Sequence, residues 1–479
     1  MKNELIFDRS FVNGIWSSSG KKTFNVYNPA NGEKISSVID GGTSMTKKAI
    51  KAANIAFKIW KETTAKHRST ILEKWSDLII RNSNQLSEII TLESGKPINE
   101  SKGEVNYGAS FVKWFAEEGK RTYGDIIPSH TKDRRLIVIK QPVGVVAAIT
   151  PWNFPLAMIT RKVSPALAAG CSVIIRPTEE SPLTALALAY LADKAGFPPG
   201  VINVVVGKNP SAMVKILCES HLVKKISFTG STRVGKILMK QSSSSLKKLS
   251  LELGGNAPFI VFDDANIDNA VEGAIASKFR NSGQTCICVN RFIVHEKVYD
   301  EFLSKLILAV EKFKIGNGMD SDVSIGPMIN SSAIKKTESF VEDAIKKGGK
   351  ILAGGKALNK FFYEPTIISN VNTNMKLANE EIFGPVAPVF KFSTDDEAIN
   401  IANDTIYGLA SYFYSQNISR CWKVAEKLEY GMVGINEGLI STEIAPFGGI
   451  KLSGHGREGS KYGIEDYLDI KYMCFGNII

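Results

Sequence analysis

Short apolar segments alternate with helical segments from residue 143 onward, and this alternation constrains the fold of the 479-residue chain more than any other feature. Runs typical of buried strands lie at 143–149, 172–175, 202–206, 225–228 and 249–253. Helices are expected between several of them, at 182–195, at 211–220 and from about 233. Because a helical crossover returns the chain to the same edge of a sheet, these strands should be parallel. The region therefore predicts a doubly wound α/β domain.

A second alternation follows between residues 259 and 433. Strands are expected at 259–262 and 292–294, with helices at 267–278 and 298–312. Residues 44–120 also carry a helical pattern, because apolar side chains recur there every three or four positions. The fold class that we expect is α/β, with two doubly wound domains.

Two further strand-like segments, 136–140 and 467–475, fit neither domain, and Gln141–Pro142 should end the first of them. An isolated strand exposes unpaired backbone groups that invite pairing with another chain. We expect these segments to form a β arm that meets another subunit, and addition to the chain's own sheet is an equal alternative. The expected divisions are 1–122 and 144–252 for the first α/β unit, 253–458 for the second, and 123–143 and 459–479 for the arm.

The composition limits the cellular compartment and the kinds of partner that we expect for this chain. No run of 18 residues is free of charged and polar breaks, and the first residues resemble neither a secretory signal nor a transit peptide, so we expect no membrane partner. Six Cys are typical of a reduced compartment, and we expect a cytoplasmic protein. The formal net charge is 59 − 48 = +11. The basic residues are dispersed without a recognition module, which argues against nucleic acid as a partner.

Two common kinds of site are missing from the sequence. The five His lie far apart, with no HExxH motif and no CxxC pair, so we expect no metal site. Gly230–Lys236 fits the start of a phosphate-binding loop, GxxxxGK, but Ile237 stands where a magnesium-binding hydroxyl is required. What remains is a strand, a turn and a helix start, whose free N–H groups favour a dinucleotide phosphate. The GxGxxG fingerprint of the standard dinucleotide-binding turn is absent.

Cys286 is the candidate nucleophile, because it follows Gly, Gln and Thr in a turn where a thiol can be reached. Cys171 and Cys474 stand in apolar runs and are expected to be buried and inert. No His is near Cys286 in the sequence, which disfavours a papain-like pair. Glu252 ends a predicted strand at the carboxyl edge of the sheet, where doubly wound sheets bind ligands, and it is the candidate base.

Asn153 follows the carboxyl end of another predicted strand, in the segment TPWNFP (150–155). An amide donor aimed at a developing oxyanion contributes about 3–4 kcal/mol to catalysis. An Asn in a proline-flanked turn is also a common turn former. Asn153 alone therefore does not distinguish an oxyanion-binding donor from an ordinary turn former.

Together these segments resemble the aldehyde dehydrogenase superfamily. The matching segments run in the order typical of the family and span nearly the whole chain: TPWNFP (150–155), PALAAG (165–170), FTGSTRVG (228–235), LELGGNAP (251–258), NSGQTC (281–286), EEIFGP (380–385) and PFGGIKLSG (446–454). The resemblance implies that the first unit binds NAD(P), that the second is catalytic, and that an aldehyde is oxidised to an acid. The alternative is a non-catalytic dinucleotide-binding relative, which the intact set of Cys286, Glu252 and Asn153 disfavours.

The resemblance also implies a role for each matched residue. Cys286 would attack the aldehyde to give a thiohemiacetal, with its oxyanion held by Asn153 and by the backbone N–H of Cys286. After hydride transfer, Glu252 would activate the water that hydrolyses the thioester. The residues implied in cofactor binding are Thr150, Pro151, Trp152, Arg176, Glu179, Gly207, Phe228, Gly230, Ser231, Gly254, Glu381 and Phe383.

One departure from the family pattern concerns the adenosine ribose. Arg176 stands where the family usually has Lys, and Glu179 follows three residues later. Arg keeps the positive charge but changes the donor geometry. A carboxylate accepts hydrogen bonds from ribose hydroxyls and repels a 2′-phosphate, so we expect NAD to be preferred, with NADP possible.

Within the superfamily, the best resemblance is to the succinate-semialdehyde dehydrogenases, through residues 277–292, 436–442 and 456–474. It implies that Arg161, Arg280 and Ser441 bind the distal carboxylate of a semialdehyde, for which Arg is a natural bidentate partner. A buried structural ion pair is the alternative for Arg161, and an ion pair that closes a helix is the alternative for Arg280. Glutarate semialdehyde stays open as the substrate.

Cys288, two residues after the candidate nucleophile, also matches this subgroup. A disulfide between Cys286 and Cys288 on a flexible loop would cap the nucleophile, and a small apolar filler is an equal alternative. The expected assembly is a homodimer or a homotetramer.

Overall fold

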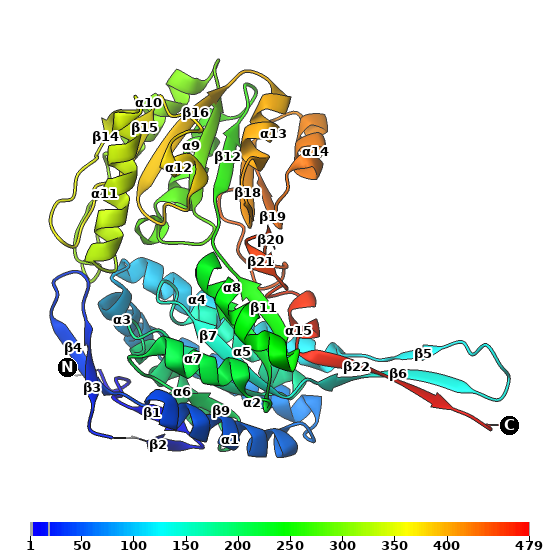
Figure 1. Ribbon diagram of the computed structural model, residues 1–479. Coiled ribbons are helices and arrows are strands. Elements are labelled where there is room, and N and C mark those ends of the chain that lie inside the picture. Colours follow the sequence, from blue (N-terminus) through cyan, green and yellow to red (C-terminus); the bar gives the residue numbers. More distant parts are fainter. Residues whose placement is uncertain (1–2, 18–19, 479) are drawn as a thin grey trace.

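The computed structural model describes residues 3–17 and 20–478. Figure 1 shows two lobes, each built around a sheet covered by helices, and a slender arm that projects from one of them. The two α/β units expected from the sequence are therefore present. In the described part of the chain, no helix is long and apolar enough to cross a membrane.

The first lobe is built on an eight-stranded sheet in the order β2-β1-β9-β8-β7-β10-β11-β21. Its parallel centre consists of β7 (Val145–Thr150), β8 (Ser172–Pro177), β9 (Ile202–Val204), β10 (Val223–Thr229) and β11 (Lys248–Glu252). From β7 the chain adds β8 and β9 on one side, and then β10 and β11 on the other. The strand order therefore reverses between β7 and β10, and doubly wound sheets bind ligands at the carboxyl ends of such strands.

The edges of this sheet come from distant parts of the chain. The hairpin of β1 (Ser10–Val12) and β2 (Ile15–Ser17) pairs with β9, and β21 (Gly454–His455) pairs with β11, all antiparallel. The sequence does not predict these strands, because two or three residues are too few to show a period. A separate hairpin is formed by β3 (Thr23–Tyr27) and β4 (Lys34–Ile39).

Helices cover both faces of the first sheet. The helical pattern of residues 44–120 is confirmed as α1 (Gly42–Trp60), α2 (Ala65–Arg81), α3 (Ser83–Ser94) and α4 (Ile98–Glu118). The crossover helices are α5 (Ala157–Ala169), α6 (Leu183–Ala195), α7 (Pro210–Glu219) and α8 (Thr232–Ser242). The sequence pattern misses α5, because every residue of this helix is buried and no polar face marks its period.

The second lobe contains a seven-stranded sheet in the order β14-β15-β16-β13-β12-β18-β19. Its strands are β12 (Ala257–Val261), β13 (Val289–His295), β14 (Lys350–Ala353), β15 (Thr366–Ser369), β16 (Val386–Phe392), β18 (Ala410–Tyr414) and β19 (Met432–Ile435). All neighbours are parallel except β14 and β15. Its helices are α9 (Ile267–Lys278), α10 (Tyr299–Val310), α11 (Ser331–Lys346), α12 (Lys376–Asn379), α13 (Asp395–Asn403) and α14 (Ile418–Lys427).

The arm is a three-stranded antiparallel sheet in the order β22-β6-β5 (Figure 1). Its strands are β5 (Asp125–Ile127), β6 (Arg135–Pro142) and β22 (Leu468–Phe475). The two unplaced segments of the sequence thus pair with each other, and they do not extend either main sheet. Two expectations are wrong here: β6 continues through Pro142, which pairs with Leu468, and Cys474 is exposed on the arm.

Candidate active site

Cys286 lies in a tightly held turn between α9 and β13. Asn281, Ser282 and Gly283 have φ angles of 51°, 55° and 74°. Left-handed conformations of Asn and Ser persist only where the surrounding structure supports them. Here the backbone N–H of Asn281 donates to a carboxylate oxygen of Glu100 at 2.8 Å. The turn that presents the thiol is thus fixed by its surroundings, in contrast to the flexible loop expected from the sequence.

Cys286 and Glu252 influence one another's ionisation. Burial raises the pKa of Cys286 well above its ordinary value, and the charge of Glu252 raises it further. Burial also raises the pKa of Glu252 to about 7, against the positive charge of Arg161. Among the described residues the Glu252 carboxylate completes no hydrogen bond of good geometry, and its nearest polar partner is the Cys286 thiol, whose contact lowers the pKa of Glu252. The site therefore combines a neutral thiol with a buried carboxyl group that exchanges its proton near neutral pH.

Asn153 is buried in the turn between β7 and α5, and its side chain faces the Cys286 turn. The amide Nδ2 donates to the carbonyl of Gln284 at 3.0 Å. The backbone carbonyl of Asn153 accepts from Lys96 Nζ at 2.6 Å and from the amide of Asn281 at 3.2 Å. One N–H of the Asn153 amide remains free for an oxyanion, since an amide nitrogen carries two protons.

A fully buried ion pair, unpredicted from the sequence, supports this turn. Lys96 and Glu104 are in direct contact, and both side chains are completely inaccessible to solvent. The other carboxylate oxygen of Glu104 accepts from the backbone N–H groups of Leu156 and Ala157, at 2.8 and 3.2 Å. Glu104 thus caps the start of α5, next to Asn153.

Cys286 lines two cavities. The first, which we call the cofactor-side cavity, has a volume of about 280 Å³ and also contains Glu252 and Asn153. The loops that follow β7, β10 and β11 form one wall, and the predicted cofactor residues that line it are Pro151, Trp152, Gly230, Ser231, Gly254, Glu381 and Phe383. The strand order reverses at this point of the sheet, so the cavity occupies the place expected for a ligand.

Two glycines in the wall of the cofactor-side cavity occupy positions that leave no space for a side chain. A Cβ atom on Gly230 would lie 2.4 Å from the ring of Phe228, and one on Gly254 would lie 2.9 Å from Glu381 Oε2. The carboxylate of Glu381 is held by the backbone N–H of Gly255 at 3.0 Å. Ser231 caps α8 by accepting from the N–H of Val234. The predicted sequence of strand, turn and helix start is therefore confirmed, with free N–H groups at its end.

The second cavity, which we call the substrate-side cavity, has a volume of about 240 Å³. All three residues predicted to bind a carboxylate line it: Arg161 on α5, Arg280 after α9, and Ser441 on the loop that follows β19. Phe154 and Phe447 contribute apolar walls. The guanidinium of Arg280 lies 5.4 Å from the ring centre of Phe154, and it has no carboxylate within 4 Å in the described ranges. The helix-closing ion pair considered for Arg280 is therefore not formed.

Arg161 forms a buried ion pair, which is the alternative considered for this residue from the sequence. Its Nε donates to Glu458 Oε2 at 2.8 Å, and Nη2 lies 2.7 Å from the same oxygen. Lys162, fully buried, contacts the other oxygen of Glu458. Burial opposes ionisation of Glu458, but Lys162 and Arg161 outweigh it and hold the pKa of Glu458 below its usual value. Arg161 nevertheless lines the substrate-side cavity, so the same side chain serves the fold and faces the site.

The aldehyde dehydrogenase family matches residues 16–473, which is nearly the entire chain. The chain belongs to the aldehyde dehydrogenase family. It is 55% identical over 477 residues to the succinate-semialdehyde dehydrogenase [NADP(+)] of Escherichia coli (strain K12), covering 99% of each chain. It is also 55% identical over 472 residues to a glutarate-semialdehyde dehydrogenase of Pseudomonas putida, covering 98% of each. The crystal structure of an E. coli NADP dependent enzyme superposes on this chain with a TM-score of 0.98, at 55% identity and 98% coverage of each chain.

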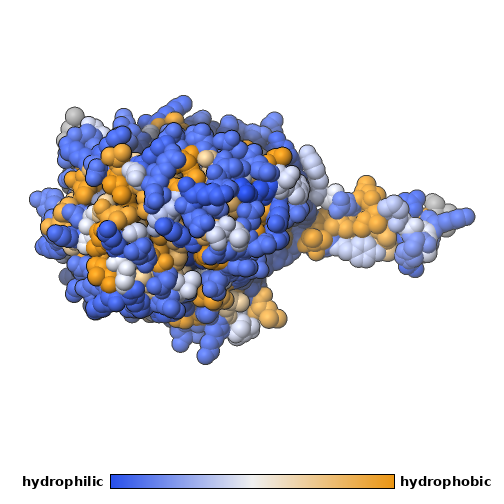
Figure 2. Space-filling model, turned by 90° about the horizontal axis from the view of Figure 1, so that it is seen from above, coloured by the Kyte–Doolittle hydropathy of each residue, from blue (hydrophilic) through white to orange (hydrophobic). Residues whose placement is uncertain are grey.

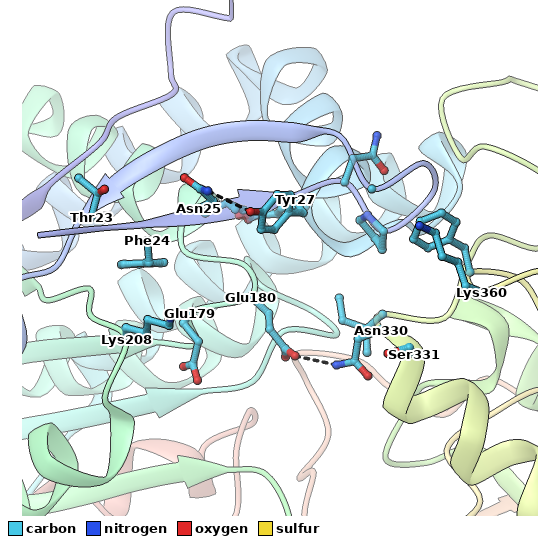
Figure 3. Close-up of a pocket in the computed structure, with 17 residues that line it drawn as sticks. Thr23, Phe24, Asn25, Tyr27, Glu179, Glu180, Lys208, Asn330, Ser331 and Lys360 are labelled. Carbon is cyan, nitrogen blue, oxygen red and sulfur yellow. Dashed lines mark hydrogen bonds between the residues drawn. The ribbon is translucent and has the colours of Figure 1, made fainter.

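In this aldehyde dehydrogenase, the predicted adenosine residues lie away from the cofactor-side cavity. Arg176 Nη2 donates to Glu179 Oε2 at 2.7 Å and lies 3.4 Å from the carbonyl of Gly207. Glu179 also lines a third cavity of about 650 Å³, between the β3–β4 hairpin and the start of α11. Figure 3 shows Glu179 near Lys208 at one end of this cavity. Thr150, at the end of β7, has a buried hydroxyl without a partner among the described residues.

Cys288 of this aldehyde dehydrogenase is buried at the start of β13. Lys278, also fully buried, has its Nζ 3.5 Å from Cys288 Sγ. Burial raises the pKa of Cys288, and the charge of Lys278 opposes that shift. Cys288 thus has an ionisable neighbour that the sequence alone does not indicate. Across residues 3–17 and 20–478, no group of three or more His, Cys, Asp or Glu side chains is placed to hold a metal ion.

Proposed function

We propose that this chain oxidises succinate semialdehyde to succinate with NAD(P), through a covalent intermediate on Cys286. The observation that carries the proposal is the position of Cys286 between two cavities, one of which holds Arg161, Arg280 and Ser441. A four-carbon semialdehyde has an aldehyde at one end and a carboxylate at the other. Its carboxylate suits a pocket with cationic donors, and its aldehyde would then face the thiol.

Cys286, Asn153 and Glu252 have different roles in the proposed reaction. The Cys286 sulfur attacks the aldehyde carbon, and the thiohemiacetal oxygen is held by the free N–H of Asn153 and the backbone N–H of Cys286. The nicotinamide supplies the hydride acceptor when it is bound. Glu252 then removes a proton from the water that attacks the thioester, which releases the acid and restores the thiol.

The cofactor fits the residues that the chain presents. We assign the nicotinamide end to the cofactor-side cavity and the adenosine end to Arg176, Glu179 and Gly207. Gly230 and Gly254 line this cavity at positions where Phe228 and Glu381 leave no space for a side chain, and the start of α8 offers free N–H groups to a pyrophosphate. In this assignment residues 1–122 and 144–252 form the cofactor-binding domain, and residues 253–458 form the catalytic domain.

We further propose a preference for NAD over NADP, in contrast to the E. coli relative that is named for NADP(+). The support is Glu179, whose carboxylate is partly exposed and lies where the adenosine ribose is expected. A 2′-phosphate would meet this negative charge. Initial rates with each cofactor test the preference, and a lower KM for NADP than for NAD would contradict it.

Glutarate semialdehyde is the second candidate substrate, because the P. putida relative named for it is as similar as the E. coli relative. The two substrates differ by one methylene, which is worth only about 1–3 kcal/mol of discrimination. A single assay of reduced nicotinamide with succinate semialdehyde, glutarate semialdehyde and butanal separates the possibilities. Butanal has no carboxylate, so equal efficiency with butanal would refute the proposed substrate class. No turnover of any aldehyde would favour a non-catalytic dinucleotide-binding protein.

The arm is proposed to join subunits of a homodimer or homotetramer. Ile126 and Ile470 on it are 80% and 71% exposed, and Figure 2 shows a hydrophobic band along the projection. Apolar side chains on a sheet with open edges favour pairing with another chain. Light scattering on the natural protein and on the double variant Ile126→Lys, Ile470→Lys tests this role of the arm. An unchanged molar mass in the variant would exclude the arm as the contact between subunits.

Cys288 is proposed to form a reversible disulfide with Cys286 under oxidation. Lys278 supports this idea, because a neighbouring ammonium favours the thiolate that attacks an oxidised sulfur. Peroxide inactivation should then be reversed by dithiothreitol in the natural protein and not in Cys288→Ala. Equal recovery of both would mean that Cys288 only fills space. The reduced state that this switch requires agrees with the cytoplasmic location that we propose.

A further inference from the structure

The substrate-side cavity contains a polar group that the substrate proposal does not use. Tyr107 projects from α4 into the cavity wall, next to Arg161, Arg280 and Ser441. Its hydroxyl is buried, and among the described residues it completes no hydrogen bond of good geometry, although the Ser441 hydroxyl lies close enough to lower its pKa. A buried hydroxyl is normally paired, since leaving it unpaired is costly, so its presence here calls for an acceptor that arrives with a ligand.

The neighbouring guanidinium points to the same missing acceptor. Arg161 Nη2 touches Glu458 at 2.7 Å but completes no hydrogen bond of good geometry, while Nε already donates to the same carboxylate. Because Nε and Nη2 of Arg161 both face Glu458, Arg161 cannot act alone as the bidentate partner of a substrate carboxylate. Glu100 and Glu104 also line this cavity, but neither completes a hydrogen bond with the Tyr107 hydroxyl or with Arg161 Nη2 among the described residues.

The ring of Tyr107 does not explain the hydroxyl. It packs edge-on against Phe111, with ring centres 5.0 Å apart and planes at 89°. A phenylalanine would make the same contact without burying an oxygen. Burial raises the pKa of Tyr107, and although Arg161 opposes that shift, the pKa stays above its usual value, so the group remains an O–H donor at physiological pH.

We propose that Tyr107 is a further substrate-binding residue, whose hydroxyl donates a hydrogen bond to the distal carboxylate of the semialdehyde alongside Arg161 and Arg280. The inference rests on the proposed function, because it needs an anionic substrate. It adds a neutral donor to a pocket in which one of the two arginines is already committed to Glu458.

Tyr107→Phe tests the assignment, with kinetics measured at saturating cofactor on succinate semialdehyde and on butanal. A hydrogen bond to a charged group supports about a tenfold or greater effect. We expect KM for succinate semialdehyde to rise about tenfold, while KM for butanal and kcat for both substrates change less than about twofold. Succinate should inhibit the variant correspondingly more weakly. Tyr190→Phe on α6, outside the cavity, is the matched control and should leave all these values unchanged.

The outcomes separate this inference from the proposed function. If the natural protein prefers succinate semialdehyde over butanal and Tyr107→Phe keeps the full preference, the role of Tyr107 is wrong and the substrate stands. An equal rise of KM for both aldehydes would also overturn the role, because it would show a general change of cavity shape. If the natural protein shows no preference for the carboxylated aldehyde, the proposed substrate and the role of Tyr107 fall together.

Discussion

The two cavities that meet at Cys286 differ in the polar groups they leave unsatisfied. In the substrate-side cavity the unsatisfied groups are donors: among the described residues neither Tyr107 Oη nor Arg161 Nη2 completes a hydrogen bond of good geometry, although Nη2 lies 2.7 Å from Glu458. In the cofactor-side cavity the unsatisfied groups are acceptors: among the described residues Asn153 Oδ1 has no donor, and the carboxylate of Glu252 has only the Cys286 thiol beside it. Groups buried in this way indicate what a ligand must bring. The first cavity suits an anion, and the second has a base that can accept a proton.

The difference follows from how the two cavities are built. Loops at the carboxyl ends of β7, β10 and β11 shape the cofactor-side cavity, and they bring Gly230, Ser231 and Gly254 to its wall. The substrate-side cavity is formed between α4, α5 and the loop that carries Ser441, so long side chains dominate it. Changes to one cavity should therefore leave the function of the other largely intact.

Replacing Cys286 by Ala should have the largest effect, because Cys286 is the residue that both cavities share in the described part of the chain. Formation of reduced nicotinamide should fall by about 10⁴-fold or more, as for the loss of other covalent nucleophiles. Binding of succinate and of NAD, measured by calorimetry, should persist, because each cavity keeps its own residues. Residual turnover within about tenfold of the natural rate would show that the nucleophile lies elsewhere.

Replacing Glu252 by Gln should uncouple the two halves of the reaction. The thioester would still form, so a burst of about one reduced nicotinamide per active site should appear, and steady turnover should be about 10²–10⁴-fold slower. Rapid mixing with absorbance detection measures both phases. A slow first turnover without a burst would assign Glu252 to an earlier step.

The pH dependence of the same variant sharpens this assignment. Glu252 has a pKa of about 7, raised first by burial, and only its ionised form is a base. Turnover of the natural protein should therefore rise as pH increases through about 7 and level off above it. The rise should vanish in Glu252→Gln. Burial also raises the pKa of Glu100 to about 7, so a rise that persists in the variant would point to Glu100 or another group.

Arg280→Gln and Arg161→Ala should separate substrate binding from folding within one cavity. Both should raise KM for succinate semialdehyde by about 10–100-fold with little change for butanal, since each removes charge-assisted hydrogen bonds. Arg161→Ala should also lower the free energy of unfolding by up to about 3 kcal/mol, because Glu458 keeps only Lys162 as its partner. Thermal unfolding measures the difference. An unchanged KM in both variants would refute the proposed carboxylate site.

The sequence predicts residues of both cavities, but it does not predict the buried contacts that hold the residues of the substrate side. Cys286, Glu252 and Asn153 were expected from strand ends and turns, which local patterns reveal, and from a resemblance that spans the chain. Glu458 and Lys162 were missed, because a buried ion pair between residues nearly 300 positions apart leaves no local pattern. Tyr107 was missed for a related reason. In the sequence it is one more large residue on a helix face, and only the fold shows that its hydroxyl lies in a cavity without a hydrogen bond of good geometry.

Glu179→Ser should have the smallest effect and should alter only the cofactor side. Glu179 pairs with Arg176, so its removal both frees the guanidinium and eliminates the negative charge that a 2′-phosphate would meet. KM for NADP should fall about tenfold and KM for NAD should rise a fewfold, while KM for succinate semialdehyde stays the same. Glu180→Gln is the matched control, because Glu180 bonds to Asn330 and not to Arg176. If Glu179→Ser also changed the KM for the aldehyde, the two cavities would be coupled through the adenosine end, and their separation by function would fail.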